Sequence, residues 1–506
     1  MKRTLSLLLA LALTLALLPT ALASADEPVT LTIMRSEHAS FTYSMSQPVI
    51  EELEKRLGIH IQLQIYPASD YNTKLSVLLG SNDLPDIAFS TYTKFADYVS
   101  QDMFVNLTDH WDELPNYAAT IDRFSSLTNA FKVDGSLYWF IMTAEDAEAY
   151  GNTPLVRQDA LAAIGWDKAP ESFDELYEML RAIKAWQPDS IPFVTRGMDV
   201  LWRMGYAYGT YNGIYYEPDE DQYMYGPLYD RYRSFLTYMK GLYTEGLLDP
   251  DFATANKTTW MENLTSGKSY FFYDNGSFTT DINMVTTAQD AEAKFVPMLT
   301  LANPFGGRRN QFFEGVGYIS PFRNDVWVIN SESAHIAEAL RLMDYLYSEE
   351  GALLCSYGIE GEHYTVDANG EIQLNMEQVA YYQQNANDPY REYKNALGTG
   401  ALAVSGRFYE TRKWFLDEDS NAMYQFWLND PYMQPYTYTL CLSADQSDAV
   451  IDKKTACDTY VESESLKFIM GVRPLEEFDG FVDELIRMGA KDVEAIYNEA
   501  YQNSLQ

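Results

Sequence analysis

Strand-like alternation and helix-like spacing of apolar side chains follow one another near the start of the chain. Val29, Leu31 and Ile33 alternate with polar residues and predict a strand. The segment after the next loop repeats apolar residues every three to four positions and ends at Gly58, as a helix does. The predicted order is strand, helix, strand, helix, strand, over residues 29–35, 47–58, 59–67, 71–82 and 84–90. The fold class is therefore α/β.

This order also predicts where a ligand would bind. Helical crossovers make neighbouring strands parallel, and ligands of open α/β sheets bind at the carboxyl ends of the strands. In this chain those ends are the polar loop 36–44, which holds Tyr43, and the turn after the third strand, which holds Ser90 and Tyr92. These two segments hold the first candidate ligand contacts.

The rest of the sequence alternates helical and strand-like segments without an internal repeat. Asp134-Gly135 predicts a tight turn, and Ser172 with Glu175 three residues later predicts a capping box. Helices are predicted at 228–244 and 333–347, strands at 268–275 and 310–330, and two terminal helices around Gly489. Two lobes with several chain crossings fit this pattern better than independent domains joined by linkers.

The first 25 residues have the pattern of a secretory signal peptide. A positive head precedes an apolar run, Leu5–Leu18, which is too short to span a bilayer. Two small-x-small sites, 21–23 and 23–25, predict cleavage before Ser24 or Asp26. We expect an exported protein, at the extracellular face of the membrane or in a periplasm. The first cysteine is Cys355, so we expect no lipid attachment through a lipobox Cys.

The chain is strongly acidic and rich in aromatic residues. It has 36 Lys and Arg against 73 Asp and Glu, a net charge of −37. Such a surface repels nucleic acid and favours a neutral ligand unless a local basic pocket exists. The 39 Tyr and 9 Trp residues are typical of a protein that stacks aromatic rings on sugars, although large secreted proteins are often rich in Tyr as well.

Signatures of catalysis and of metal binding are missing. The five His residues form no H-E-x-x-H motif, and no G-x-S-x-G motif is present. We therefore expect no catalytic residues, no metal site and no cofactor. Cys441 and Cys457 are close enough in sequence to pair in an oxidising compartment, but two free buried thiols fit equally well.

The stretch 358–372, GIEGEHYTVDANGEI, has three possible interpretations. Glu360 and Glu362 suggest an acid/base pair, but they flank a glycine and lack the rigid support that glycoside hydrolysis needs. The Asp-x-Asn-Gly run from Asp367 resembles the opening of a calcium loop but favours a hairpin turn. The preceding loop is then either a solvated acidic loop or a ligand rim that presents Glu362 and Tyr364.

Several segments in a fixed order resemble one family. They are SNDLPDIAFSTY, VDGSLYWF, VRQDALAAIGWDKAPESFDELYEML, LYTEGLLDPDF, YGIEGEHYTVDANGEI and FDGFVDELIRMGAKDVEAIYNEAY. Their order and spacing resemble family 1 extracellular solute-binding proteins, in the subgroup that serves oligosaccharide ABC importers. The resemblance implies a two-lobed periplasmic-binding-protein-like fold of type 2, joined by hinge strands, that closes on a sugar without catalysis. The implied partners are an oligosaccharide and membrane permease subunits, and we expect a monomer.

The resemblance also implies a division of the chain and two departures from the family. Lobe 1 is expected at 26–145 with a return segment near 310–375, and lobe 2 at 146–309, with a largely helical 376–506 packing on lobe 2 and the hinge. The lipobox Cys of many relatives is absent. Alginate-type relatives carry a calcium loop where this chain has 185–197, whose only candidate ligand is Asp189.

The candidate ligand contacts are aromatic and polar residues at strand ends or in loops that the resemblance places near the cleft. They are Tyr43, Ser90, Tyr92, Trp139, Arg157, Trp202, Tyr273, Asp274, Trp327, Glu362 and Tyr364. Trp139 is the leading candidate because the family's chain crosses between the lobes just after it. Trp202 lies in a helical pattern that would equally bury it in a core, and Arg157 would equally form a surface ion pair.

Two other functions compete with sugar import. A secreted glycoside hydrolase requires two rigidly held carboxylates, which the sequence does not offer. A peptide-binding component of an ABC importer is hardly distinguishable from a sugar-binding one by sequence. The sequence leaves open the identity and length of the sugar and the permease that receives it.

Overall fold

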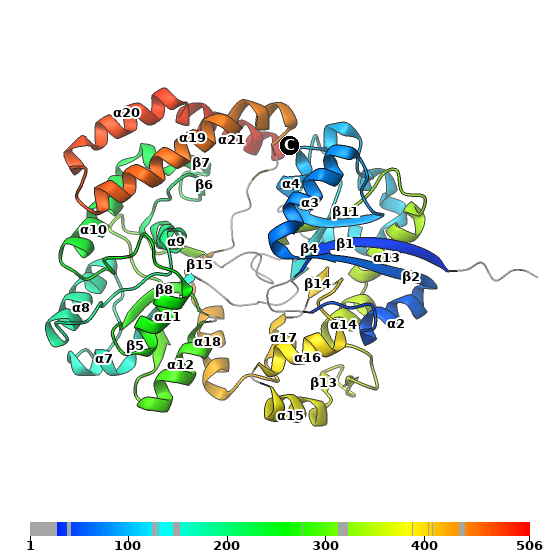
Figure 1. The fold of residues 1–506 in the computed structure, drawn as a ribbon, viewed down its shortest axis with the longest axis horizontal. Coiled ribbons are helices and arrows are strands. Elements are labelled where there is room, and N and C mark those ends of the chain that lie inside the picture. Colours follow the sequence, from blue (N-terminus) through cyan, green and yellow to red (C-terminus); the bar gives the residue numbers. More distant parts are fainter. Residues whose placement is uncertain are drawn as a thin grey trace, which may run out of the picture.

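The computed structural model describes most of the chain as one α/β protein. The described residues are 28–37, 42–123, 128, 131–144, 152–276, 278–311, 322–386, 388–402, 404–406, 408–434, 440 and 442–505. The expected signal peptide, residues 1–25, lies outside them. Figure 1 shows two lobes side by side: one combines the blue N-terminal elements with yellow-green ones, and the other combines green elements with the orange and red C-terminal helices.

Lobe 1 is built on a six-stranded sheet with the order β14-β4-β11-β3-β1-β2. Its strands are β1 (Val29–Ser36), β2 (Ile59–Tyr66), β3 (Ile87–Thr91), β4 (Phe140–Ala144), β11 (Phe322–Ile329) and β14 (Ser405–Gly406). Its helices are α2 (Pro48–Leu57), α3 (Ala68–Ser81), α4 (Tyr92–Ala96), α5 (Pro115–Arg123), α13 (Ile336–Tyr347), α14 (Glu349–Tyr357), α15 (Met376–Asn385), α16 (Pro389–Leu397) and α17 (Phe408–Arg412). A hairpin of β12 (Tyr364–Val366) and β13 (Ile372–Leu374) completes it.

Lobe 2 is built on the three-stranded sheet β8-β5-β9 and a separate hairpin. Its strands are β5 (Asn152–Arg157), β6 (Ile214–Glu217), β7 (Gln222–Tyr225), β8 (Phe271–Asn275), β9 (Phe295–Pro297), β10 (Asn310–Gln311) and β15 (Met433–Gln434). Its helices are α7 (Gln158–Ala163), α8 (Phe173–Trp186), α9 (Met198–Tyr208), α10 (Asp230–Thr244), α11 (Lys257–Thr265), α12 (Phe278–Gln289), α18 (Glu418–Leu428), α19 (Ala444–Ile469), α20 (Phe478–Met488) and α21 (Ala490–Ser504).

The local signals in the sequence explain how the first elements form. Strands β1, β2 and β3 pair in parallel, as the predicted crossovers require. Gly58 ends α2 in the left-handed conformation, with φ of 62°, which glycine adopts at no steric cost. The Ser172 hydroxyl accepts the Glu175 N–H at 3.1 Å and caps α8. The Glu175 carboxylate accepts from Glu171 N–H instead of the Ser172 N–H, so the capping box is half formed.

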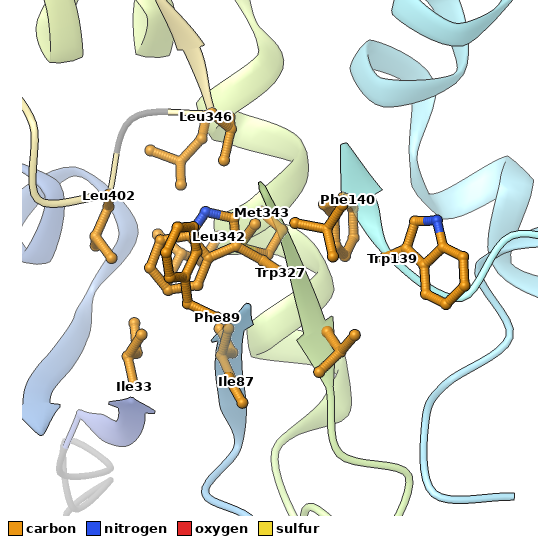
Figure 2. Packing of buried hydrophobic residues seen from close by; sticks show 14 of the residues in the cluster. Ile33, Ile87, Phe89, Trp139, Phe140, Trp327, Leu342, Met343, Leu346 and Leu402 are labelled. Atoms are coloured by element: carbon orange, nitrogen blue, oxygen red, sulfur yellow. The ribbon is translucent and has the colours of Figure 1, made fainter. Parts of the chain in front are cut away.

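Each lobe has its own hydrophobic core. In lobe 1, the Trp327 ring of β11 packs 4.8 Å from Phe89 of β3, and Figure 2 shows both rings beside Leu342 and Met343 of α13. In lobe 2, one core lies beneath α8, α10 and α19, and a second joins α11, α12 and α18 to β5, β8 and β9. The expected two-lobed α/β architecture is confirmed.

The return of the chain to lobe 1 is longer than predicted. Residues 376–415 contribute Val379, Tyr393 and Phe415 to the lobe 1 core, where the sequence interpretation assigned them to lobe 2 and the hinge. The amphipathic helices α15 and α16 are local features, but the core that covers them is not encoded locally. The chain passes between the two cores at 144–152, 311–322 and 415–423.

Candidate functional site

The crossing between the lobes identifies one edge of the lobe 1 sheet. Strand β11 runs antiparallel to β3 and β4, so the carboxyl ends of β1, β3, β4 and β14 lie at the same edge as the amino end of β11. From this edge the chain leaves Ala144 and enters lobe 2 at Asn152, a span of at most about 28 Å. We call it the lobe-1 edge; it carries the loop and the turn that the sequence predicts to bind ligand.

Arg35 occupies the lobe-1 edge at the end of β1. Its guanidinium lies 3.9 Å from the centre of the Tyr43 ring and 5.0 Å from that of Phe89. Nη1 donates to the Gly400 carbonyl at 3.1 Å and to the Ala401 carbonyl. The predicted contact Tyr43 is therefore half-buried with one face against a cation, and burial raises the pKa of its hydroxyl.

The corresponding edge of lobe 2 is the amino end of β5 beside the carboxyl end of β8. Asn152 and Asn275 are partners in this antiparallel pair, followed by Thr153 and Asp274. We call this the lobe-2 edge. The chain enters lobe 2 here, and the predicted contact Asp274 lies on it.

Asp274 and Arg196 form a two-point ion pair on the lobe-2 edge. Arg196 Nε donates to one carboxylate oxygen at 2.6 Å and Nη2 to the other at 3.1 Å. Burial raises the pKa of the Asp274 carboxyl, which is 1% exposed, and the Arg196 charge opposes that rise. Arg196 remains partly exposed, and no acceptor for its Nη1 lies among the described residues. The pair thus holds a planar donor group in a fixed orientation.

Amide side chains connect this edge to the crossing strand β10. The Tyr273 hydroxyl donates to Asn310 Oδ1 at 2.6 Å, and Asn310 Nδ2 donates to the Asn152 carbonyl. Arg203 Nη1 from α9 donates to Asn152 Oδ1 at 3.4 Å. Asn310 and Asn152 are 1% and 6% exposed, so these bonds fix the edge from within. The partly exposed groups that can meet the hydroxyls of a polar ligand are Arg196, Arg203 and Asn275.

The remaining predicted contacts are buried or lie away from the two edges. Ser90 lies on β3 near the lobe-1 edge but is 8% exposed. Tyr92, Trp139 and Trp327 are at most 1% exposed in the lobe 1 core, and Trp202 is buried against Tyr232 in lobe 2. In this conformation none of these four aromatic predictions offers a ring face to a ligand, because apolar side chains cover them.

Arg157, Tyr364 and Glu362, the last predicted contacts, also lie away from the two edges. Arg157 lies at the opposite end of β5, where its Nε donates to Asp159 at 2.9 Å, so the ion-pair alternative describes it. Tyr364 is buried against Tyr357. Glu362 is exposed in the loop before the β12–β13 hairpin, which belongs to neither edge.

The hairpin interpretation of 358–372 is confirmed. Strands β12 and β13 pair in antiparallel register across a turn in which Gly370 has φ of 84°. Glu360 and Glu362 are both exposed, while His363 is buried and accepts the Ile359 N–H at 3.0 Å through Nδ1. This loop has the character of a structural turn with solvated acids.

Sequence reasoning missed the arginines of the two edges. Arg35 is the last residue of the predicted strand 29–35, so the carboxyl-end rule that selected the following loop could have selected it. Arg196 and Arg203 lie in the segment around the expected helix α9, and their partners are 78 and 51 residues away in sequence. Local pattern carries no signal for such pairs.

The described residues contain no group of three or more His, Cys, Asp and Glu side chains placed to hold a metal ion, and Asp189 is exposed. Cys355 and Cys457 are free, and burial raises the pKa of these thiols to about 12 and about 11. Cys441 lies outside the described residues. No described helix is long and apolar enough to cross a bilayer.

Comparison with known proteins finds relatives along nearly the whole chain. Lipoprotein LipO of Bacillus subtilis is 23% identical over 91% of this chain and 90% of its own length. The polygalacturonan/rhamnogalacturonan-binding protein YtcQ of the same organism is 23% identical over 90% of this chain and 88% of its own length.

Solved structures share the fold. The alginate-binding protein AlgQ2, in a structure without calcium ion, superimposes with a TM-score of 0.73 at 20% identity, covering 94% of this chain and 98% of that one. An HMO-binding ABC-transporter solute-binding protein of Bifidobacterium longum infantis gives 0.75 at 16% identity, covering 94% and 99%. The sequence model for bacterial extracellular solute-binding proteins matches residues 36–353, more than half of the chain. The chain therefore belongs to this family, whose members bind solutes and are not enzymes.

Proposed function

We propose that this protein binds an oligosaccharide between the lobe-1 edge and the lobe-2 edge and delivers it to the permease of an ABC importer. The observation that carries the proposal is the Arg196–Asp274 pair beside Asn152 and Asn275. Sugar hydroxyls both donate and accept hydrogen bonds, and an edge of amides and a fixed guanidinium supplies both partners.

The printed names of several relatives support a sugar as the ligand. YtcQ is named for polygalacturonan and rhamnogalacturonan, and MelE of Bacillus subtilis, 25% identical over 45% of this chain, for melibiose, raffinose and stachyose. A FusA structure with kestose superimposes with a TM-score of 0.69. These proteins bind sugars of different composition, so the names favour a carbohydrate without selecting one.

Closure of the two lobes is the proposed binding motion. The chain joins the lobes three times, between Ala144 and Asn152, between Gln311 and Phe322, and between Phe415 and Met423. Closure would rotate one lobe relative to the other. A side-chain contact joins the lobes: the Ser447 hydroxyl of α19 in lobe 2 donates to Asp97, which follows α4 in lobe 1, at 3.5 Å. We propose lobe 1 as 26–144 with 322–415 and lobe 2 as 152–311 with 423–506.

The family also bears on where the protein acts. Members are extracellular, and we propose a secreted monomer that meets its permease at the outer face of the membrane. LipO, a relative along most of the chain, is named a lipoprotein.

A thermal-shift panel tests the function. A ligand that binds only the folded protein raises the melting temperature by mass action, so at least one oligosaccharide in a panel of neutral and acidic sugars should raise it, whereas peptides of matched length should not. Chromatography after prolonged incubation should recover the bound sugar intact. A shift with peptides alone, or steady release of cleaved sugar, would refute the proposal.

A further inference from the structure

Arg35 is a buried cation that forms no ion pair with a carboxylate of the described residues. The residue is 6% exposed, and its donors reach only backbone oxygens: Nε donates to Ser36 at 3.3 Å and Nη1 to Gly400 and Ala401. The negative charge of Asp325 raises the pKa of Arg35 from a distance, but no carboxylate of the described residues forms an ion pair with it. The other two buried arginines among the described residues, Arg157 and Arg309, each form an ion pair with a carboxylate.

Aromatic rings and backbone carbonyls, rather than an anion, surround Arg35. Burying a charge without a partner is unfavourable, and cation–π contacts offset part of that cost. The guanidinium has such contacts with Tyr43, Phe89 and Trp327, at 3.9, 5.0 and 5.6 Å. Burial lowers the pKa of Arg35, which is the direction expected for a cation that lacks an anion.

The two N–H groups of Nη2 remain available. Among the described residues, the hydrogen bonds of this guanidinium use only Nε and Nη1. Nη2 has no such bond and is not one of the fully buried polar atoms. The group lies at the lobe-1 edge, where the chain leaves for lobe 2. A ligand between the lobes could therefore reach it.

A second cation lies close by. A Cβ placed on Gly400 would lie 3.6 Å from the Tyr43 ring and 3.9 Å from Cε of Lys394, which is 8% exposed. Two buried cations thus approach the same glycine in a protein whose net charge is −37.

We propose that Arg35 receives the carboxylate of an acidic sugar, so that the oligosaccharide contains uronic acid residues. A carboxylate oxygen accepting from Nη2 forms a charge-assisted hydrogen bond, which is about twice as strong as a neutral one. The Tyr43 ring beside it places an aromatic surface next to the anion site, as a sugar ring with a carboxylate substituent requires. This inference rests on the proposed sugar-binding function.

Matched ligands test the inference without altering the protein. Trimers of galacturonate, mannuronate and glucuronate are titrated calorimetrically against their own methyl esters, which keep the size and hydroxyls and remove the charge. At least one acid should bind tenfold or more tightly than its ester, about 1.4 kcal/mol, and added salt should reduce this difference. Esters or neutral sugars that bind as well as every acid would overturn the inference and leave the function standing. Failure of all sugars, neutral and acidic, would refute the function as well.

Variants then assign the preference to Arg35. Arg35→Gln should remove the preference for acid over ester while changing affinity for the ester less than threefold, and Arg35→Lys should retain part of it. Arg181→Gln, which alters an exposed arginine of lobe 2 paired with Glu245, should change neither. Melting curves confirm that each variant folds. A folded Arg35→Gln protein with an undiminished preference would refute the role of Arg35, and if Arg35→Gln does not fold, Arg35→Lys with an unreduced preference would do the same.

Discussion

Trp427 lies directly against the backbone of Gly276, so that a Cβ at residue 276 would stand 2.3 Å from Cζ2 of the indole. Gly276 follows Asp274 and Asn275 at the lobe-2 edge, and Trp427 belongs to α18, the first helix after the chain re-enters lobe 2. This contact seats the re-entering chain against the candidate ligand site. It requires glycine because the 2% exposed Trp427 ring is enclosed by other side chains.

Gly276→Ala should therefore reduce both stability and ligand affinity. Overpacking a closed contact costs about 1–3 kcal/mol, and displacement of the indole would shift the neighbouring Asp274. Thermal unfolding and calorimetry measure the two effects. The control is Gly80→Ala in α3, where nothing lies within 4 Å of an added Cβ; it should leave affinity unchanged and stabilise by about 0.5–1 kcal/mol. A Gly276→Ala protein as stable as the wild type would contradict the contact.

Asp274→Asn should weaken oligosaccharide binding by tenfold or more. The substitution keeps the size of the side chain but removes the charge that holds Arg196 in two-point geometry, so the guanidinium loses its fixed orientation. Calorimetry with the best sugar of the panel measures the change. Glu245→Gln removes the exposed partner of Arg181 in the same lobe and should bind normally; equal losses in both variants would show that the effect is not local.

Trp139→Ala should destabilise the protein by about 3–5 kcal/mol, the usual cost of truncating a buried aromatic residue. The ring is 0% exposed and packs 6.2 Å from Tyr92. Chemical denaturation measures the loss, and Trp186→Ala, which truncates a partly exposed tryptophan, should cost much less. Normal stability combined with weak sugar binding would return Trp139 to the ligand site.

The buried Glu217–Arg309 pair predicts a contribution to acid sensitivity. Burial alone would raise the pKa of Glu217, but hydrogen bonds and charge from Arg309 outweigh it, and the pKa is lowered. A lowered pKa means that the unfolded chain binds the proton more readily, so the stabilisation is present above the ordinary Glu value and is lost as pH falls through the folded value.

Melting temperature measured from about pH 6 to about pH 3 tests this sign. The wild type should lose stability steeply in the acid part of this range. Glu217→Gln should melt lower at about pH 6, because removing one partner of a buried pair costs about 3–5 kcal/mol, and its curve should be flatter toward acid. Parallel curves for the two proteins would show that Glu217 does not titrate as inferred.

The elements of the fold were predictable where the signal is local. The periodicity of residues 29–90, the Gly58 stop and the Asn-Gly hairpin each depend on a few neighbouring side chains, and the structure contains all three. The placement of 376–415 was not predictable in this way. An amphipathic helix such as α16 requires an apolar surface to cover it, and its sequence does not say which lobe supplies that surface.

The candidate site was predictable only as a region. The carboxyl-end rule selected the loop with Tyr43, and the strand 268–275 pointed to Asp274. The sequence alone could not separate an aromatic residue that stacks on a ligand from one that fills a core, and Trp139 fills a core. The net charge of −37 favours a neutral ligand, but it is a sum over the whole surface and does not describe the surroundings of Arg35.

Lobe closure on a sugar is the central claim, and small-angle X-ray scattering tests it most directly. The measurement compares the radius of gyration of the ligand-free protein with that of the protein saturated with its best oligosaccharide, saturation being verified by calorimetry. The account predicts a reproducible contraction that follows the binding isotherm and is absent with a sugar that does not bind. An unchanged radius at full saturation would contradict closure of the two lobes on the ligand.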